Sequence, residues 1–399
     1  MTIATEITAL NNNLAAAKTA VTNKGGTVGD TGLAGLATEI ASIPAGGASW
    51  GSVTYLDSGV SKTVTVNTMA EMYSLAGSAN SWTATIGGET ITNTTITSVT
   101  VGKDFSLFPT NFCTNCTNLT SMTFENGNPV KTLPNYFCKN TGITSLTLPS
   151  GIEKIGDYFM NNCNGITSLT FPSSLTTIGR DCFSNCTTIV TISGLDNVTT
   201  IGNNFCANTP LDCDISLPAL ENTASNTGEQ FLQNCTSFNH TITINPNYTG
   251  TMNGFLKGCT SYNKPLTIPS GVKYVSNLLQ NCTSFNQPLT LPTSTTTVVG
   301  MLSGCTSLNS DITVNAANQS LTLYGNTNIM QNCDSMTATV YFNCSVTMGS
   351  GTDTTSFSTT STSSPCYATG IKISGTYAAS WRSVLADRSS SPYRKLIVV

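Results

Sequence analysis

A short phrase that ends in cysteine recurs along this chain at a nearly constant interval. It consists of two apolar residues, two small or polar residues and Cys, as in the FMNNC phrase at Phe159–Cys163. Ten copies end at positions 116, 141, 163, 186, 209, 235, 259, 282, 305 and 333, and Thr replaces Cys at 141 and 209. A period near 23 residues is typical of a solenoid, in which stacked turns share one core.

Each copy is predicted to contain two structural halves. The apolar residues of the phrase fit one helical turn with a buried face. The second half alternates apolar and polar residues, as in Leu146-Thr147-Leu148 and Leu289-Thr290-Leu291, which predicts a strand. Proline follows several of these strands and should end them. The sequence therefore predicts an α/β solenoid of about ten repeats.

Two versions of the repeat resemble a known family. Residues 145–157 (SLTLPSGIEKIGD) and 168–179 (SLTFPSSLTTIG) resemble the BspA-type leucine-rich repeat. Residues 259–266 and 282–289 are similar to a sister subtype with an FNxPL signature. The resemblance implies a curved right-handed solenoid with a parallel sheet along one face. It also implies adhesion rather than catalysis, since the family occurs on bacterial surfaces and in bacteriophage particles.

The chain divides into four regions. Residues 1–45 are predicted to form a helical anchor or oligomerisation segment, and residues 50–95 a small β module that caps the first repeat. Residues 96–342 carry the repeats. Residues 343–399 begin with a Ser/Thr-rich stretch and end in a C-terminal cap, with a helix near 381–386 and a strand at 395–399. Long spacings predict insertions near 220–228 and 316–328.

The N-terminal region carries an apolar seam at heptad-like spacing, which favours a helix that packs on a partner. Its residues are Ile3, Ile7, Leu10, Leu14, Val21, Leu33, Leu36 and Ile40. The phrase at Lys24–Val28 makes this region similar to the helical N-termini of phage fibre and appendage proteins. That resemblance implies attachment to a virion, whereas an ordinary helical cap or oligomerisation piece is the alternative.

The repeated cysteines allow three interpretations: a disulfide ladder, a metal site or a column of buried thiols. Equivalent residues on adjacent parallel turns lie about 4.8 Å apart, which disulfides tolerate, but their side chains would point the same way. Cys113 and Cys116 form a C-x-x-C pair without a second pair at zinc spacing. We therefore predict a column of reduced thiols at Cys116, Cys163, Cys186, Cys235, Cys259, Cys282, Cys305 and Cys333.

The middle residue of each predicted strand should point outward and form a hydroxyl row. The row comprises Thr123, Thr147, Thr170, Ser193, Ser216, Thr243, Thr267, Thr290 and Thr313, and ends with Tyr341. One interpretation is a flat surface that binds glycans or another polymer. The other is that Thr is simply a suitable residue for an exposed strand, and this reading is favoured.

Composition excludes several classes of function. Charged residues make up 9 % of the chain, and the formal net charge is -4, which argues against binding of nucleic acid. His240 is the single histidine, no nucleophile lies at a motif spacing from it, and no Gly-rich phosphate loop follows a strand. We expect no catalytic site, no metal and no cofactor. No membrane span and no secretory signal are expected either.

These observations lead to the expectation of a non-enzymatic bacteriophage fibre or appendage protein. The N-terminal helices would attach it to other virion proteins, it would form a homo-oligomer, and its repeats would meet a host-surface glycan or protein. Localisation would be the virion, after assembly in the host cytoplasm. The alternatives are a bacterial cell-surface adhesin and a structural decoration protein without receptor binding.

Overall fold

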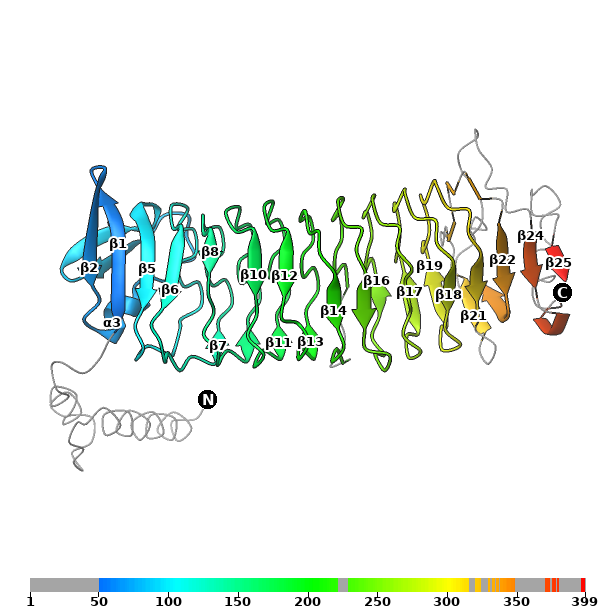
Figure 1. Cartoon of the computed structure of the whole chain (residues 1–399), viewed down its shortest axis with the longest axis horizontal. Helices are drawn as coiled ribbons and strands as arrows, with labels where there is room; N and C mark the ends of the chain where they lie inside the picture. The colour runs from blue at the N-terminus through cyan, green and yellow to red at the C-terminus, as the bar shows by residue number, and fades with distance from the viewer. Residues whose placement is uncertain are drawn as a thin grey trace, which may run out of the picture.

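The protein is a straight stack of about nine turns of β-solenoid (Figure 1). The structure, a computed structural model, describes residues 50–221 and 229–315 together with shorter pieces between 320 and 398. Strands of neighbouring turns pair in parallel with a register shift of 23 residues, as at Ser168↔Thr191 and Thr177↔Thr200. The predicted repeat period is therefore confirmed. The predicted segment 1–45, with its apolar seam, lies outside the described residues.

One row of strands runs along the length of the stack and contains the predicted LTL-type segments. Its members are β5 (Ile96–Val101), β6 (Ser121–Phe124), β8 (Ser145–Leu146), β10 (Ser168–Thr170), β12 (Thr191–Ser193), β14 (Ile215–Leu217), β15 (Ile242–Ile244), β18 (Leu289–Leu291), β20 (Ile312–Val314), β22 (Thr339–Phe342), β24 (Gly370–Ile373) and β25 (Leu396–Val398). Residues 266–268 keep the alternation of buried and exposed side chains but are not part of a ladder.

A second row of parallel strands, which the sequence analysis did not predict, follows about nine residues after the first. It consists of β7 (Thr132–Leu133), β9 (Lys154–Ile155), β11 (Thr177–Ile178), β13 (Thr200–Ile201), β16 (Met252–Asn253), β17 (Tyr274–Ser276), β19 (Thr297–Val299), β21 (Ser320–Leu323) and β23 (Ser345–Met348). The expected parallel sheet along one face is present, and this second row of parallel strands accompanies it. The apolar residues of these second-row strands, such as Ile155 in β9 and Ile178 in β11, are buried and form this side of the core.

The predicted helical turn in each repeat is wrong, and the fold class is a β-solenoid rather than α/β. Between residues 96 and 315, apart from the gap at 222–228, the repeats contain no helix. At the first phrase, the preceding residue Asn111 and the alternate residues Cys113 and Asn115 have φ angles of 65°, 52° and 63°. A left-handed residue cannot continue a right-handed helix. Its N–H instead donates to the neighbouring turn, as from Asn115 to the carbonyl of Lys139 at 2.9 Å.

The residue before each repeated cysteine explains why asparagine and glycine recur there. This position has a positive φ in every described turn, and Asn and Gly are the residues that adopt this region most readily. Its occupants are Asn115, Asn140, Asn162, Asn185, Asn208, Asn234, Gly258, Asn281, Gly304 and Asn332. Several of the amides also bond to one another from turn to turn. Asn162 Nδ2 donates to Asn140 Oδ1 at 3.0 Å, and Asn234 Nδ2 donates to Asn208 Oδ1 at 2.9 Å.

The core consists of columns of like side chains. Seven buried phenylalanines from successive turns follow one another with ring centroids 4.9 to 6.0 Å apart. They are Phe112, Phe137, Phe159, Phe183, Phe205, Phe231 and Phe255. A second aromatic column begins where the repeat subtype changes and contains Phe238, Tyr262 and Phe285. One turn alone would leave these rings in water, so stacking provides most of the apolar burial.

An N-terminal β module covers the first turn. Strands β1 (Gly51–Asp57) and β2 (Val60–Thr65) form an antiparallel pair, and β1 pairs antiparallel with β5. The module continues with the short helix α3 (Met69–Tyr73), the hairpin of β3 (Thr83–Ile86) and β4 (Glu89–Thr92), and the 3₁₀ turn η1 (Asn93–Thr95). Gly87 and Gly88 join β3 and β4, and both glycines have positive φ, as a type I′ turn requires.

At the other end, β24 and β25 continue the first row in parallel. A short 3₁₀ turn, η2 (Gly375–Tyr377), follows β24. The strand predicted for residues 395–399 is present as β25. The Ser/Thr-rich stretch and the predicted helix near 381–386 lie outside the described residues, as do most residues of the two predicted insertions.

Replacement of Asn162 by Ala should destabilise the stack. Ala lacks the amide that bonds to Asn140, and a non-glycine residue without a local hydrogen bond is strained at φ 61°. We expect a loss of about 1–2 kcal/mol in the free energy of unfolding. Urea unfolding followed by circular dichroism would measure it. Asn162→Gly should lose less, and exposed Thr147→Ala is the control. Equal stability of N162A and wild type would contradict this account of the ladder.

Replacement of Tyr262 by Phe should leave stability unchanged or raise it by about 1 kcal/mol. The Tyr262 side chain is fully buried between Phe238 and Phe285, and its hydroxyl has no hydrogen-bond partner. An unsatisfied buried hydroxyl loses its hydration on folding without compensation. Thermal unfolding of Y262F would test this. A clear fall in the midpoint would show that the hydroxyl makes a favourable interaction.

Candidate functional site

The predicted hydroxyl row lies on the outer side of the first strand row. The side chains from Thr123 to Thr290 are exposed, whereas Thr313 and Tyr341 are half-buried. Register pairs Thr170 with Ser193, Ser216 with Thr243, and Thr313 with Tyr341. Thr170 Oγ1 and Ser193 Oγ are 3.0 Å apart. The sheet thus presents regularly spaced hydroxyl groups, each able to donate and to accept hydrogen bonds.

The second strand row carries another line of outward side chains that the sequence analysis missed. Thr132, Lys154, Thr177 and Thr200 are consecutive register partners, and Tyr274 pairs with Thr297 farther along. The repeated TTI phrases at 176–178 and 199–201 were a usable signal for this row. The solenoid therefore presents two strand rows whose outward side chains are rich in hydroxyl groups and poor in charge.

The repeated cysteines form a buried column of thiols. Fourteen of the fifteen cysteines lie in the described part of the chain, and all fourteen are reduced. Most thiols of the column donate to a backbone carbonyl of the preceding turn. Cys163 Sγ donates to the carbonyl of Cys138 at 3.0 Å, and Cys259 Sγ to that of Leu232 at 3.0 Å. Where Thr replaces Cys, Thr141 and Thr209 donate to carbonyls of their own turns at 2.9 and 2.8 Å.

Burial makes these thiols poor nucleophiles, because the thiolate is the reactive form. It raises the pKa of Cys163 and of Cys235 to about 11, and that of Cys282 to about 12. Desolvation is the main cause in each case, since a buried thiolate would lose its hydration. The column therefore serves packing and hydrogen bonding rather than chemistry.

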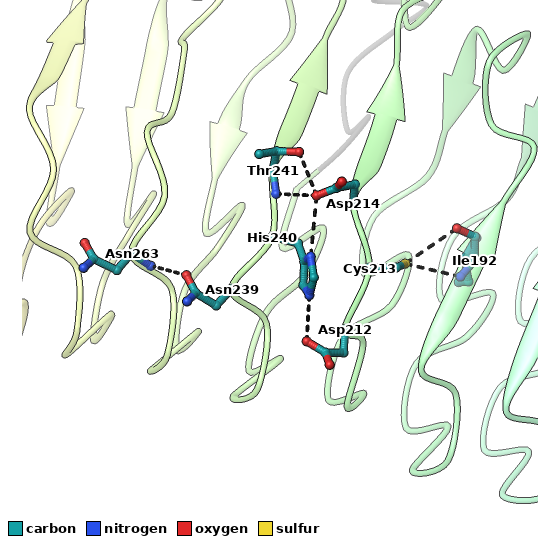
Figure 2. Close-up of polar contacts among 8 residues, drawn as sticks. All are labelled: Ile192, Asp212, Cys213, Asp214, Asn239, His240, Thr241 and Asn263. Atoms are coloured by element: carbon teal, nitrogen blue, oxygen red, sulfur yellow. Dashed lines mark hydrogen bonds and ion pairs between the residues drawn. The ribbon is translucent and has the colours of Figure 1, made fainter.

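The structure places His240 beside two carboxylates of the preceding turn, which the sequence analysis did not anticipate (Figure 2). His240 Nε2 is 2.9 Å from Asp212 Oδ1, and Nδ1 is 3.5 Å from Asp214 Oδ1. Asp214 also accepts hydrogen bonds from the backbone N–H and the hydroxyl of Thr241. Each carboxylate contacts a different nitrogen of the imidazole ring. The two carboxylates and one ring nitrogen therefore do not point at a common position where a metal ion could bind.

Cys213, between the two aspartates in sequence, points away from His240 toward Ile192 (Figure 2). Its Sγ lies 3.4 Å from the Ile192 nitrogen and 3.6 Å from the Ile192 carbonyl oxygen. Desolvation, with Asp214 and Asp212 nearby, raises the pKa of the Cys213 thiol. A thiol in this position is neither ionised nor aimed at the imidazole. Cys213, His240 and the two aspartates therefore connect neighbouring turns and do not form a pair of nucleophile and base.

Among the residues that the structure describes, no three His, Cys, Asp or Glu side chains are placed to hold a metal ion together. Within the same residues, no helix has the length and apolar character that would let it cross a lipid bilayer.

Two family models match the solenoid. Residues 78–167 and 107–239 match the BspA type leucine rich repeat region (6 copies). Residues 199–315 match a Mycoplasma protein family of unknown function. The two matched regions overlap at residues 199–239, and the second aromatic column begins in this overlap with Phe238. No curated protein matches the chain.

Two solved structures are similar to this chain at low identity. A leucine rich cell surface protein from Faecalibacterium prausnitzii is 17 % identical, with a TM-score of 0.29, over 56 % of this chain and 80 % of the other. A leucine-rich repeat protein from Bacteroides ovatus is 12 % identical, with a TM-score of 0.41, over 87 % of this chain and 98 % of the other.

The thiol column should make stability fall at alkaline pH. In the unfolded chain a thiol ionises near pH 8.5, whereas Cys163 keeps its proton in the fold to about pH 11. A raised folded-state pKa contributes stability that is complete below the unfolded value and is lost as pH rises toward the folded value. Urea midpoints at pH 7, 9 and 10 would measure the loss.

The control is C163T, a change to the residue that occupies positions 141 and 209. It should fold and show a weaker dependence on pH between 8.5 and 11. A wild-type midpoint that is constant over this range, or native thiols that react with a disulfide reagent as fast as unfolded ones, would show that the column is accessible.

Proposed function

We propose that this chain is an adhesion solenoid displayed on a bacterial cell surface. Its match to the BspA type leucine rich repeat region, a family that is typically non-enzymatic, supports this proposal. The first strand row of the stack would contact glycans or glycoproteins of a host or of a neighbouring cell. The single observation that carries this proposal is the continuous exposed row from Thr123 to Thr290 on a rigid frame.

The geometry of the row supports polymer binding. Parallel pairing keeps successive hydroxyl groups in register, as with Thr170 opposite Ser193 and Thr290 opposite Thr313. A polymer that follows the rod can therefore form the same contact at each turn, so that weak individual contacts add up. The low content of charge means that hydrogen bonding and shape, rather than ionic attraction, would select the partner.

A bacteriophage fibre or appendage protein is the second candidate function. The reduced state of the 14 described cysteines supports it, since thiols survive best in a protein that folds and assembles in a reducing cytoplasm. Attachment to other virion proteins and assembly into a homo-oligomer would involve residues 1–45. Mass spectrometry would distinguish the two candidates, because the chain would be found either in purified phage particles or in the cell envelope of a bacterium.

Adhesion can be tested with the full chain coupled to fluorescent beads. Wild-type beads should bind cultured epithelial cells or immobilised mucin. The variant T147E/S193E places two charges on the first row without making them neighbours. Because a carboxylate resists desolvation, it should reduce bound beads by about tenfold, equivalent to about 1.4 kcal/mol.

The matched control is T132E/T177E, which introduces the same charges on the second row. These beads should bind like wild type, and both variants should keep the wild-type circular dichroism spectrum. The proposal for the first row fails if wild-type beads bind neither surface, or if the two variants lose binding equally.

A further inference from the structure

Two tyrosines occupy a backbone position that other turns give to smaller polar residues or glycine. Tyr136 and Tyr158 have φ angles of 60° and 57°. The equivalent residues of other turns, also at positive φ, are Asn111, Asp181, Asn204, Gln230, Gly254, Asn277 and Gly300. A bulky side chain is disfavoured in this region. Because the fold accepts Asn or Gly here, it does not itself require tyrosine, and strain of this kind accumulates at functional sites.

The two rings form a parallel pair on the surface. Their centroids are 5.0 Å apart and their planes differ by 4°. Both side chains are half-buried, so part of the pair faces solvent. Half-exposed tyrosines present an apolar ring and a polar hydroxyl together, which suits ligands that have both kinds of surface.

Two cations flank the pair. Lys139 Nζ is 5.4 Å from the centre of the Tyr136 ring and 5.3 Å from that of Tyr158, so it lies beside both rings. The Arg180 guanidinium lies 5.3 Å from the centre of the Tyr158 ring. The Arg180 side chain is 57 % exposed, and its nearest acid, Asp157, is 3.5 Å away. A ligand could therefore displace the guanidinium and contact the ring.

The charges around the pair are balanced. Asp157 contacts Arg180, and Asp181 interacts with the hydroxyl of Tyr158. Two carboxylates thus accompany the two cations. A strongly anionic ligand would meet the acids as well as the bases, which leaves an uncharged ligand with many hydroxyl groups as the best match.

We propose that Tyr136 and Tyr158 form the aromatic platform of a binding site for a neutral saccharide. The apolar face of a pyranose ring would pack on the tyrosines, and its hydroxyls would accept hydrogen bonds from Lys139 and Arg180 and donate them to Asp157 and Asp181. This inference rests on the proposed adhesion function and adds to the first strand row a second binding site, at the edge that follows β7 and β9.

The test measures binding of the full chain to soluble polysaccharides by affinity electrophoresis and calorimetry. Yeast mannan, dextran and galactan are the neutral probes, and hyaluronan is the acidic probe. The variant Y136N/Y158N installs the residue found at this position in other turns. It should weaken binding of the preferred neutral probe at least tenfold without lowering the thermal midpoint, because Asn suits a positive φ. Y274T, which removes an exposed tyrosine from the second row, should bind like wild type.

The site is refuted if the wild-type chain binds none of the neutral probes, if hyaluronan is preferred, or if Y136N/Y158N binds as tightly as wild type. The bead assay separates this failure from failure of the proposed function. Adhesion of wild-type beads that persists in Y136N/Y158N would overturn the tyrosine site and leave adhesion standing, whereas loss of adhesion by T147E/S193E alone would locate binding on the first row.

Discussion

Backbone hydrogen bonds between neighbouring turns determine the rest of this structure. At the buried phrase, residues with positive φ turn their N–H groups along the rod axis, where each meets a carbonyl of an adjacent turn: Asn162 donates to Ser184 of the next turn, and Cys138 donates to Phe112 of the preceding one. The same chain segment could not satisfy these groups alone, because a helix would need right-handed residues throughout. Neighbouring turns are therefore needed for hydrogen bonding as well as for burial of apolar surface.

Once adjacent turns are held in register, each side chain contacts the side chains at the equivalent position of the neighbouring turns. Phenylalanines stack, thiols donate to the preceding turn, and asparagine amides bond to one another. Columns of identical neutral groups are compatible with this arrangement, whereas a column of like charges would repel itself. The requirement for register thus accounts for the scarcity of charge, and it leaves hydroxyl groups as the main polar groups on the two strand rows.

Much of the fold could be predicted from the sequence, because the recurring cysteines set the period and the alternation around Thr147 and Thr170 identified one strand row. The helical turn was wrong because apolar residues at i, i+1 and i+4 fit a helix as well as they fit a tight turn. The asparagine or glycine before each cysteine, which favours positive φ, was the discriminating signal. The second row was missed because β9 and β11 are two residues long. The contacts of His240 and the pairing of Tyr136 with Tyr158 were not predicted, because they depend on which residues of neighbouring turns come to lie side by side.

The inter-turn hydrogen bonds also give the rod a direction. At the cysteine phrases most N–H groups face the following turn, as from Asn162 to Ser184, whereas the thiols and many N–H groups near the strands face the preceding turn, as from Thr176 to Glu153. The two ends of a stack are therefore chemically different. The antiparallel β1–β2 pair occupies the first of these ends. Since each internal turn contacts only its neighbours, duplication of one 23-residue unit would insert a turn whose two faces already fit the turns on either side of it. The length of the rod can thus change over generations in fixed steps, without redesign of either end.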